Sequence, residues 1–138
     1  MARWTCPACD REFGRTRQSH FCVPGCTVDE TFAGRPPEQR AAYDAVMAHL
    51  RGLGPVHDDA VRVGVFVKSD RTIAELRPKS RWLSLEIALP RRIDDPRFSR
   101  VIDASGDRTI HVVRLRTAAD VDGQVRQWLT EAYTYATG

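Results

Sequence analysis

Four cysteines and a histidine are crowded into the first 26 residues, and this cluster constrains the fold more than any other feature of the sequence. Cys6 and Cys9 are separated by two residues, and His20 and Cys22 by one. Zinc prefers four tetrahedral ligands, thiolates and imidazoles, which are commonly supplied as pairs from two tight turns. The spacing therefore predicts a zinc-binding finger over residues 1–27, with Cys6, Cys9, His20 and Cys22 as the ligands.

Cys26 leaves a second ligand set open. Cys6, Cys9, Cys22 and Cys26 would form a four-cysteine site, with His20 beside it. A thioredoxin-type redox pair is disfavoured, because its strand and helix setting cannot be built from the few residues before Cys6. Either metal site has four protein ligands and is closed, so the zinc is expected to be structural and to fold a segment too short to bury a core.

The aromatic and arginine side chains of the finger lead to two further expectations. Its aromatic residues should supply the apolar contacts of the small module: Trp4, Phe13 and Phe21. Three thiolates around one zinc ion leave a net negative charge, which the arginines of the finger loop should partly offset: Arg11, Arg15 and Arg17.

The rest of the chain alternates between helical and strand-like patterns. Residues 28–36 are predicted to be a linker, and residues 37–138 a single domain. Pro37 suits the first turn of a helix that extends to about Arg51, and apolar residues recur along it at helical spacing: Ala42, Val46, Leu50 and Leu53. Strands are predicted over residues 61–67, 72–77, 82–89, 99–103 and 108–116.

Thr117 and Asp120 resemble a capping box that starts a C-terminal helix. A run of strands with one helix before it and one after it favours an α+β fold. The predicted architecture is an antiparallel β-sheet with an N-terminal and a C-terminal helix packed on one face, preceded by the small zinc finger.

The sequence gives no sign of a membrane segment. No apolar run approaches the roughly 20 residues that span a bilayer, and the first residues lack the apolar stretch of a secretory signal. We therefore expect a cytoplasmic protein without a membrane partner, in a reducing compartment that disfavours disulfides.

Arginine dominates the basic residues, since only Lys68 and Lys79 of the 21 basic residues are lysines. Arginine is suited to bidentate contacts with phosphate or carboxylate groups. Strand alternation places Lys68, Arg77, Trp82, Arg114 and Arg116 opposite the apolar face, and the predicted binding surface adds Lys79 and His111 to them. Such a surface suits a protein or nucleic-acid partner, unless the finger or a second copy of the chain, in a homodimer, covers it.

Catalytic motifs such as GxSxG, HExxH and a phosphate-cradling glycine loop do not occur in the sequence. This favours a non-enzymatic, zinc-stabilised interaction module that binds a protein or nucleic-acid partner through one surface formed by the finger and the exposed sheet face. The alternative is a small-ligand binding protein or an enzyme with a pocket near Lys68, Trp82 and His111. His111 lies in a strand pattern beside Val113 and Leu115, which favours a half-buried histidine over a general base.

Three segments carry a family resemblance: "ELRPKSRWLSLEIALP", "DPRFSRV" and "IHVVRLRTAADVDGQVRQWLTEAY". From about Pro36 to Tyr133 the chain resembles a bacterial domain of unknown function whose members are sometimes labelled "predicted transport protein". The resemblance implies an α+β fold with helices flanking a sheet. In several relatives the domain follows a finger with a CxxC and a "QSHxC" element, which supports the CCHC ligand set here, and some relatives look joined to nuclease-like modules. The basic and aromatic positions of the family motif match Arg77, Lys79, Trp82, His111 and Arg114.

Overall fold

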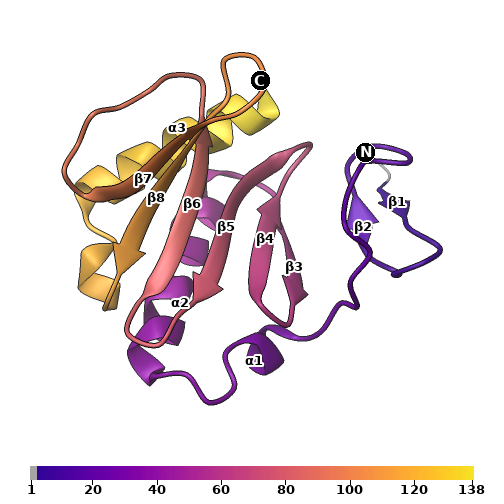
Figure 1. The fold of residues 1–138 in the computed structure, drawn as a ribbon, viewed down its shortest axis with the longest axis horizontal. Coiled ribbons are helices and arrows are strands. Elements are labelled where there is room, and N and C mark those ends of the chain that lie inside the picture. Colours follow the sequence, from indigo (N-terminus) through magenta and orange to yellow (C-terminus); the bar gives the residue numbers. More distant parts are fainter. Residues whose placement is uncertain (1–2) are drawn as a thin grey trace.

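A computed structural model describes residues 3–138 and confirms the α+β fold (Figure 1). Six strands form one antiparallel sheet in the order β3-β4-β5-β6-β8-β7, and β1 and β2 form a separate small hairpin. The strands are β1 (Trp4–Thr5), β2 (Glu12–Phe13), β3 (His57–Val61), β4 (Gly64–Lys68), β5 (Thr72–Pro78), β6 (Leu83–Leu89), β7 (Phe98–Asp103) and β8 (Thr109–Leu115). The helices are α1 (Val28–Thr31), α2 (Pro37–Leu53), the 3-10 turn η1 (Ala118–Asp120) and α3 (Gly123–Thr137).

Helices α2 and α3 cover one face of the sheet, and the other face is open over much of its width (Figure 1). Alternation along β6 points Leu83, Leu85, Ile87 and Leu89 toward the helices, where all four are buried. The apolar side chains of the helices pack against them in one core, which includes Leu50 of α2 and Leu129 of α3. The side chains that alternate with these leucines therefore form the second face of the sheet, which we call the outer face.

Helix α2 begins at Pro37, as predicted, and buries Ala42, Val46 and Leu50 against the sheet. Leu53 was expected in the same stripe but is partly exposed at the last helical residue. The Thr117–Asp120 capping box also forms, but it closes only the short turn η1. Helix α3 then starts anew, because the Asp122 side chain accepts a hydrogen bond from the Val125 N–H at 3.0 Å.

The strand predicted over 61–67 is confirmed only for residues 64–67, which lie in β4, because the chain reverses at its start. β3 ends at Val61 and β4 begins at Gly64, so Arg62 and Val63 form the turn and Val63 is 61% exposed. Alternating valines continue through the turn without the Asn-Gly or Asp-Gly signal that marks many tight hairpins. A Cβ on Gly64 would lie 2.8 Å from the Leu76 carbonyl oxygen, so β4 can approach β5 closely at this position only with glycine.

The segment predicted as a linker is packed against the sheet. Thr27 and Glu30 form a capping box for α1, and the Thr31 hydroxyl donates to the Val61 carbonyl at 2.6 Å. Phe32 is buried in the core of the domain. Just before α1, Gly25 pairs with Val61 as an isolated antiparallel bridge, and the Cys26 N–H donates to the Ala60 carbonyl at 2.9 Å. The chain between the finger and the domain thus lies against the Ala60–Val61 end of β3, at the free edge of the sheet.

No helix within residues 3–138 combines the length and the apolar character that a membrane crossing requires.

His111 is fully buried on the face of β8 that meets the helices. Its Nε2 accepts a hydrogen bond from the Ile93 N–H at 3.0 Å, so Nδ1 carries the proton and donates to the Thr109 carbonyl at 3.2 Å. Its ring lies 4.7 Å from that of Phe98, between centroids. Burial, helped by the nearby charges of Arg92 and Arg91, lowers the pKa of His111. His111 is therefore a hydrogen-bonded core residue.

We predict that His111→Ala lowers the free energy of unfolding by about 2–4 kcal/mol, because it leaves a cavity and an unpaired Ile93 N–H. The measurement is urea unfolding followed by circular dichroism. His57→Ala, at a partly exposed position, is the control and should cost less than about 1 kcal/mol. Equal stability of the His111 variant and the wild type would contradict the structural role.

Candidate functional site

The first two potential metal ligands, Cys6 and Cys9, lie on the turn between β1 and β2. The Cys6 N–H donates to the Arg11 carbonyl at 2.9 Å, and the Asp10 N–H donates to the Cys6 carbonyl at 2.8 Å. Asp10 adopts a left-handed conformation with φ of 59°, which closes the turn. The thiols of Cys6 and Cys9 are thereby held on one side of the hairpin.

His20 and Cys22 complete a compact cluster with Cys6 and Cys9, in which all four potential ligand atoms lie within 4.8 Å of one another. The Cys6 and Cys22 sulfurs are 3.7 Å apart, and His20 Nε2 lies 3.5 Å from the Cys9 sulfur and 3.4 Å from the Cys22 sulfur. Three sulfurs and one imidazole nitrogen are a donor set that suits a tetrahedral metal ion. The cluster could therefore hold a metal.

The orientation of His20 agrees with a ligand role. Its Nδ1 lies 2.6 Å from the Gln18 carbonyl and donates to it, which leaves Nε2 unprotonated and directed at the thiols. The imidazole stacks on the Phe13 ring at a centroid distance of 3.9 Å. The hairpin that carries two of the thiols thus also fixes the ring of the histidine.

Cys26 is not part of this cluster. Its sulfur lies 3.4 Å from the Thr31 hydroxyl oxygen, at the start of the domain. The geometry thus brings together the CCHC set that the sequence predicts and places the alternative fourth cysteine elsewhere.

The close approach of the thiols shifts the pKa values of Cys6 and Cys22 in opposite directions. Desolvation acts to raise the pKa of Cys6, but hydrogen bonds from the backbone at Ala8 and Cys9 and from the neighbouring thiols lower it to about 6. The hydrogen bond with Cys6, desolvation and the charge of Cys6 raise the pKa of Cys22 to about 11. Without a cation, the cluster therefore resists carrying several negative charges, and a metal ion would displace protons from it.

A buried ionic triad joins the finger to the sheet. Nε of Arg11 donates to both carboxylate oxygens of Asp59, at 3.1 and 3.0 Å, and Lys68 Nζ donates to Asp59 Oδ2 at 2.8 Å. Arg11 belongs to the finger, Asp59 to β3 and Lys68 to β4, and their exposures are 6%, 6% and 4%. Burial opposes ionisation of Asp59, but the two cations hold the pKa of this carboxyl below its usual range.

Aromatic rings and backbone groups enclose this triad. Lys68 Nζ lies 3.9 Å from the centroid of the Phe13 ring and also donates to the Glu12 carbonyl at 3.2 Å. The Arg11 guanidinium lies 5.2 Å from the centroid of the Phe66 ring. Arg11, expected to balance the charge of the metal site, instead binds the domain, and Lys68, expected on an open binding surface, lies beneath the finger.

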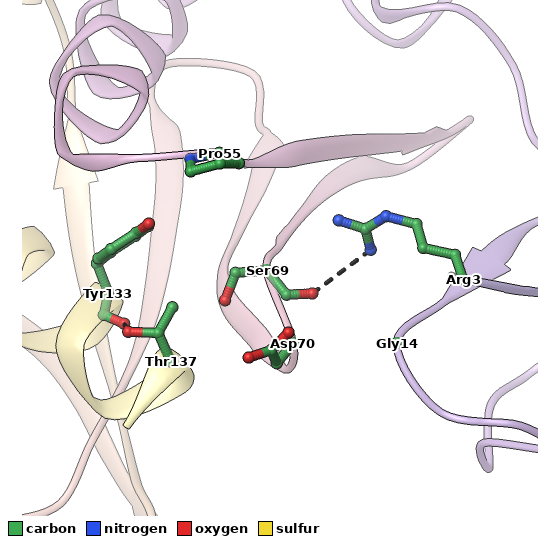
Figure 2. A pocket seen from close by; sticks show the side chains of 7 residues that line it. All are labelled: Arg3, Gly14, Pro55, Ser69, Asp70, Tyr133 and Thr137. Carbon is green, nitrogen blue, oxygen red and sulfur yellow. Dashed lines mark hydrogen bonds between the residues drawn. The ribbon is translucent and has the colours of Figure 1, made fainter. Parts of the chain in front are cut away.

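A second contact fixes the other side of the finger (Figure 2). Arg3 extends across a pocket toward the β4–β5 turn, where its Nη1 donates to the Ser69 carbonyl at 3.4 Å. Gly14 lies against the same turn, and a Cβ at this position would collide with the Asp70 carbonyl oxygen. The finger and the sheet therefore meet through backbone as well as through charged side chains.

We predict that Asp59→Asn lowers the free energy of unfolding by about 3 kcal/mol at pH 7, because it leaves the charges of Arg11 and Lys68 buried without a carboxylate. The pKa of Asp59 is depressed in the folded state, so its contribution is present above about pH 4 and is lost as the pH falls through the folded-state pKa. The difference between wild type and variant should therefore narrow below about pH 4. Urea unfolding at neutral and acidic pH measures it.

The exposed carboxylate of Asp44, which pairs with Arg40, offers a control for this prediction. Asp44→Asn should change stability by less than about 0.5 kcal/mol. A difference for Asp59→Asn that stays constant down to pH 3, within the range where both forms fold, would contradict the charge-based account.

The outer face carries a hollow of about 370 Å³ beyond the reach of the finger. This sheet hollow is lined on the strands and turn from β5 to β7, and its charged and aromatic residues are Arg77, Lys79, Trp82, Glu86, Arg100 and Arg114. The Arg114 guanidinium stacks over the Trp82 ring at 4.2 Å from its centroid, and Arg116 lies 5.8 Å from the same centroid. Four residues of the predicted binding surface thus line one hollow, Arg77, Lys79, Trp82 and Arg114, and Arg116 lies next to it through Trp82.

Two residues of that surface lie elsewhere. Lys68 is held beneath the finger, and His111 points into the core on the opposite face. Lys68 and Trp82 line different hollows, and His111 lines neither of them. The structure therefore does not assemble Lys68, Trp82 and His111 around a common pocket.

The sequence pattern missed three residues that matter here. Asp59 lies in "HDDAV", which looks more like a polar loop than a buried strand. Arg100 lies in the strand predicted over 99–103 without being part of the predicted binding surface, although its pairing with Val112 places it on the outer face. Phe21, expected to pack inside the finger, is 90% exposed, and the residues on each side of it belong to the Cys/His cluster.

These features define the chain as an α+β domain with an antiparallel sheet and an N-terminal hairpin beside a Cys/His cluster. A family model described as "Domain of unknown function (DUF5655)" matches residues 28–136, and the chain belongs to this family. No curated protein and no solved structure matches the chain. The matched region begins with α1, so the segment predicted as a linker lies within the family domain and the finger precedes it.

Proposed function

We propose that this protein is a zinc-stabilised, non-enzymatic interaction module that binds a protein or nucleic-acid partner through the outer face of its sheet. The observation that carries this proposal is the sheet hollow, where uncompensated cations surround a tryptophan on an otherwise folded domain. Among residues 3–138, Lys79, Arg100, Arg114 and Arg116 take part in no ion pair. Cations without a carboxylate partner in the folded domain are available to an anionic partner.

Zinc is the metal that the cluster would hold on chemical grounds. Three thiolates and an imidazole within 4.8 Å match its tetrahedral preference and leave no open coordination position for catalysis. The bound ion would hold His20 and Cys22 against the hairpin. Because Arg11 lies on that hairpin, the metal also supports the finger's contact with Asp59.

We predict that protein purified without added zinc carries one zinc ion per chain, measured by inductively coupled plasma mass spectrometry. His20→Ala should lose the metal, because it removes the only nitrogen ligand of the cluster. Cys26→Ala is the control and should retain it. Loss in the Cys26 variant alone would move the site to four cysteines, and a metal-free wild type would overturn the zinc proposal.

We predict that Arg100→Ser weakens binding to heparin, a polyanion without bases, because it removes one unpaired cation from the sheet hollow. The measurement is the salt concentration at which the zinc-loaded protein elutes from a heparin column. Arg35→Ser removes the same charge at a position that lines neither of the two hollows and is the matched control. Equal shifts for the two variants would show that net charge, not this face, governs the interaction.

A further inference from the structure

The sheet hollow continues into a second hollow beneath the finger. This finger hollow, of about 410 Å³, lies between the finger and the β3–β4 hairpin, and its aromatic residues are Phe13, Phe21 and Phe66. Arg77 lines both hollows, so they adjoin along the outer face. Together they make one track in which aromatic rings and cations succeed each other, from Phe21 and Phe66 past Arg77 to Trp82 and Arg114.

Phe21 is the residue of this track whose side chain contributes least to the folded structure, because its ring is exposed. Its ring is 90% exposed, whereas its backbone is fixed: His20 and Cys22 flank it in the metal cluster, and its carbonyl accepts from Arg11 Nη1 at 3.2 Å. A large aromatic side chain on a rigid backbone loses little conformational freedom when a ligand packs on it. Val63 and Val23, which line the same hollow, are also exposed.

The charge along the track is positive on balance. Arg77 is compensated, because its Nε lies 2.6 Å from Glu75 Oε1 and 3.6 Å from Glu86 Oε2. Lys79, Arg100 and Arg114 in the sheet hollow have no such carboxylate within residues 3–138. A ligand with repeated negative charges and flat apolar surfaces would complement both properties at once.

We infer that this track binds single-stranded nucleic acid, a partner class within the interaction function proposed above, on which this inference rests. Unpaired bases would pack on Phe21 and on the stacked pair of Trp82 and Arg114, since aromatic and guanidinium planes both serve as stacking platforms. Phosphates between the bases would meet Lys79, Arg100 and Arg114. The open outer face resembles in kind the sheet surfaces on which exposed aromatics stack single-stranded bases.

A duplex fits this surface less well. Both long helices, α2 and α3, lie on the opposite face of the sheet, so the basic face presents no helix for a major groove (Figure 1). Stacked and paired bases also cannot present their faces to Phe21 or Trp82. The inference therefore predicts a preference for unpaired strands and not only for negative charge.

The test is fluorescence anisotropy with zinc-loaded full-length protein and labelled oligothymidylate or oligouridylate of about 12 nucleotides, against a duplex of similar length. The wild type should bind at least one single strand more tightly than the duplex, and its affinity should fall as salt rises. Phe21→Ala and Arg114→Ser should each weaken binding about tenfold. Phe21→Trp, which keeps a stacking surface, and Arg35→Ser, off the track, should stay within about twofold of the wild type.

Several results would overturn the inference: duplex binding as tight as single-strand binding, equal competition by polyglutamate, or an unchanged affinity in Phe21→Ala. Absence of oligonucleotide binding would overturn it as well. If Arg100→Ser still weakened heparin binding selectively in that case, the outer face would remain the interaction surface and its partner would be an acidic protein. If the Arg100 and Arg35 variants behaved alike on heparin, the proposed function itself would fail.

Discussion

The buried contact of Asp59 with Arg11 and Lys68 is the interaction on which the arrangement of this protein depends. Burying charge is costly, and such a group persists only where geometry and hydrogen bonding are nearly complete. Here Arg11 and Lys68 both donate to the carboxylate of Asp59. Their excess positive charge is stabilised by cation–π contacts with the Phe13 and Phe66 rings and by the hydrogen bond from Lys68 to the Glu12 carbonyl. Because its members come from the finger, β3 and β4, the triad makes a small hairpin and a larger domain into one surface.

The charged side chains of the outer face have different partners at its two sides. At the β3–β4 side the finger covers the sheet, and the charged side chains beneath it, Asp59 and Lys68, form buried ion pairs. Toward β8 and β7 the cations remain at the surface, and arginine stacks on tryptophan in place of pairing with a carboxylate. The finger thus has two roles: it carries the Cys/His cluster, and it forms one wall of the hollow that borders the open part of the sheet.

Much of this arrangement could be predicted from the sequence, because the relevant signals are local. The ligand cluster follows from residue spacing, and four strands and both long helices follow from periodicity, as in the alternation from Leu83 to Leu89. The hairpin at Arg62–Val63 could not be found this way, since valines alternate on both sides of it. Asp59 and Phe21 show the deeper limit. Whether a carboxylate is buried or an aromatic ring is exposed depends on the docking of segments far apart in the chain, which local pattern does not encode.

The bridge between Gly25 and Val61 has a consequence for solubility. An open sheet has two edges whose unpaired backbone groups can recruit another chain. At β7 the edge is interrupted by an irregularity between Phe98 and Arg100 and carries charged, exposed side chains. At β3 the end of the edge at Ala60 and Val61 is covered by the segment that leads out of the finger, through Gly25 and Cys26. The segment that joins the finger to the domain therefore also occupies one end of a strand edge, and there it limits edge-to-edge pairing with another chain.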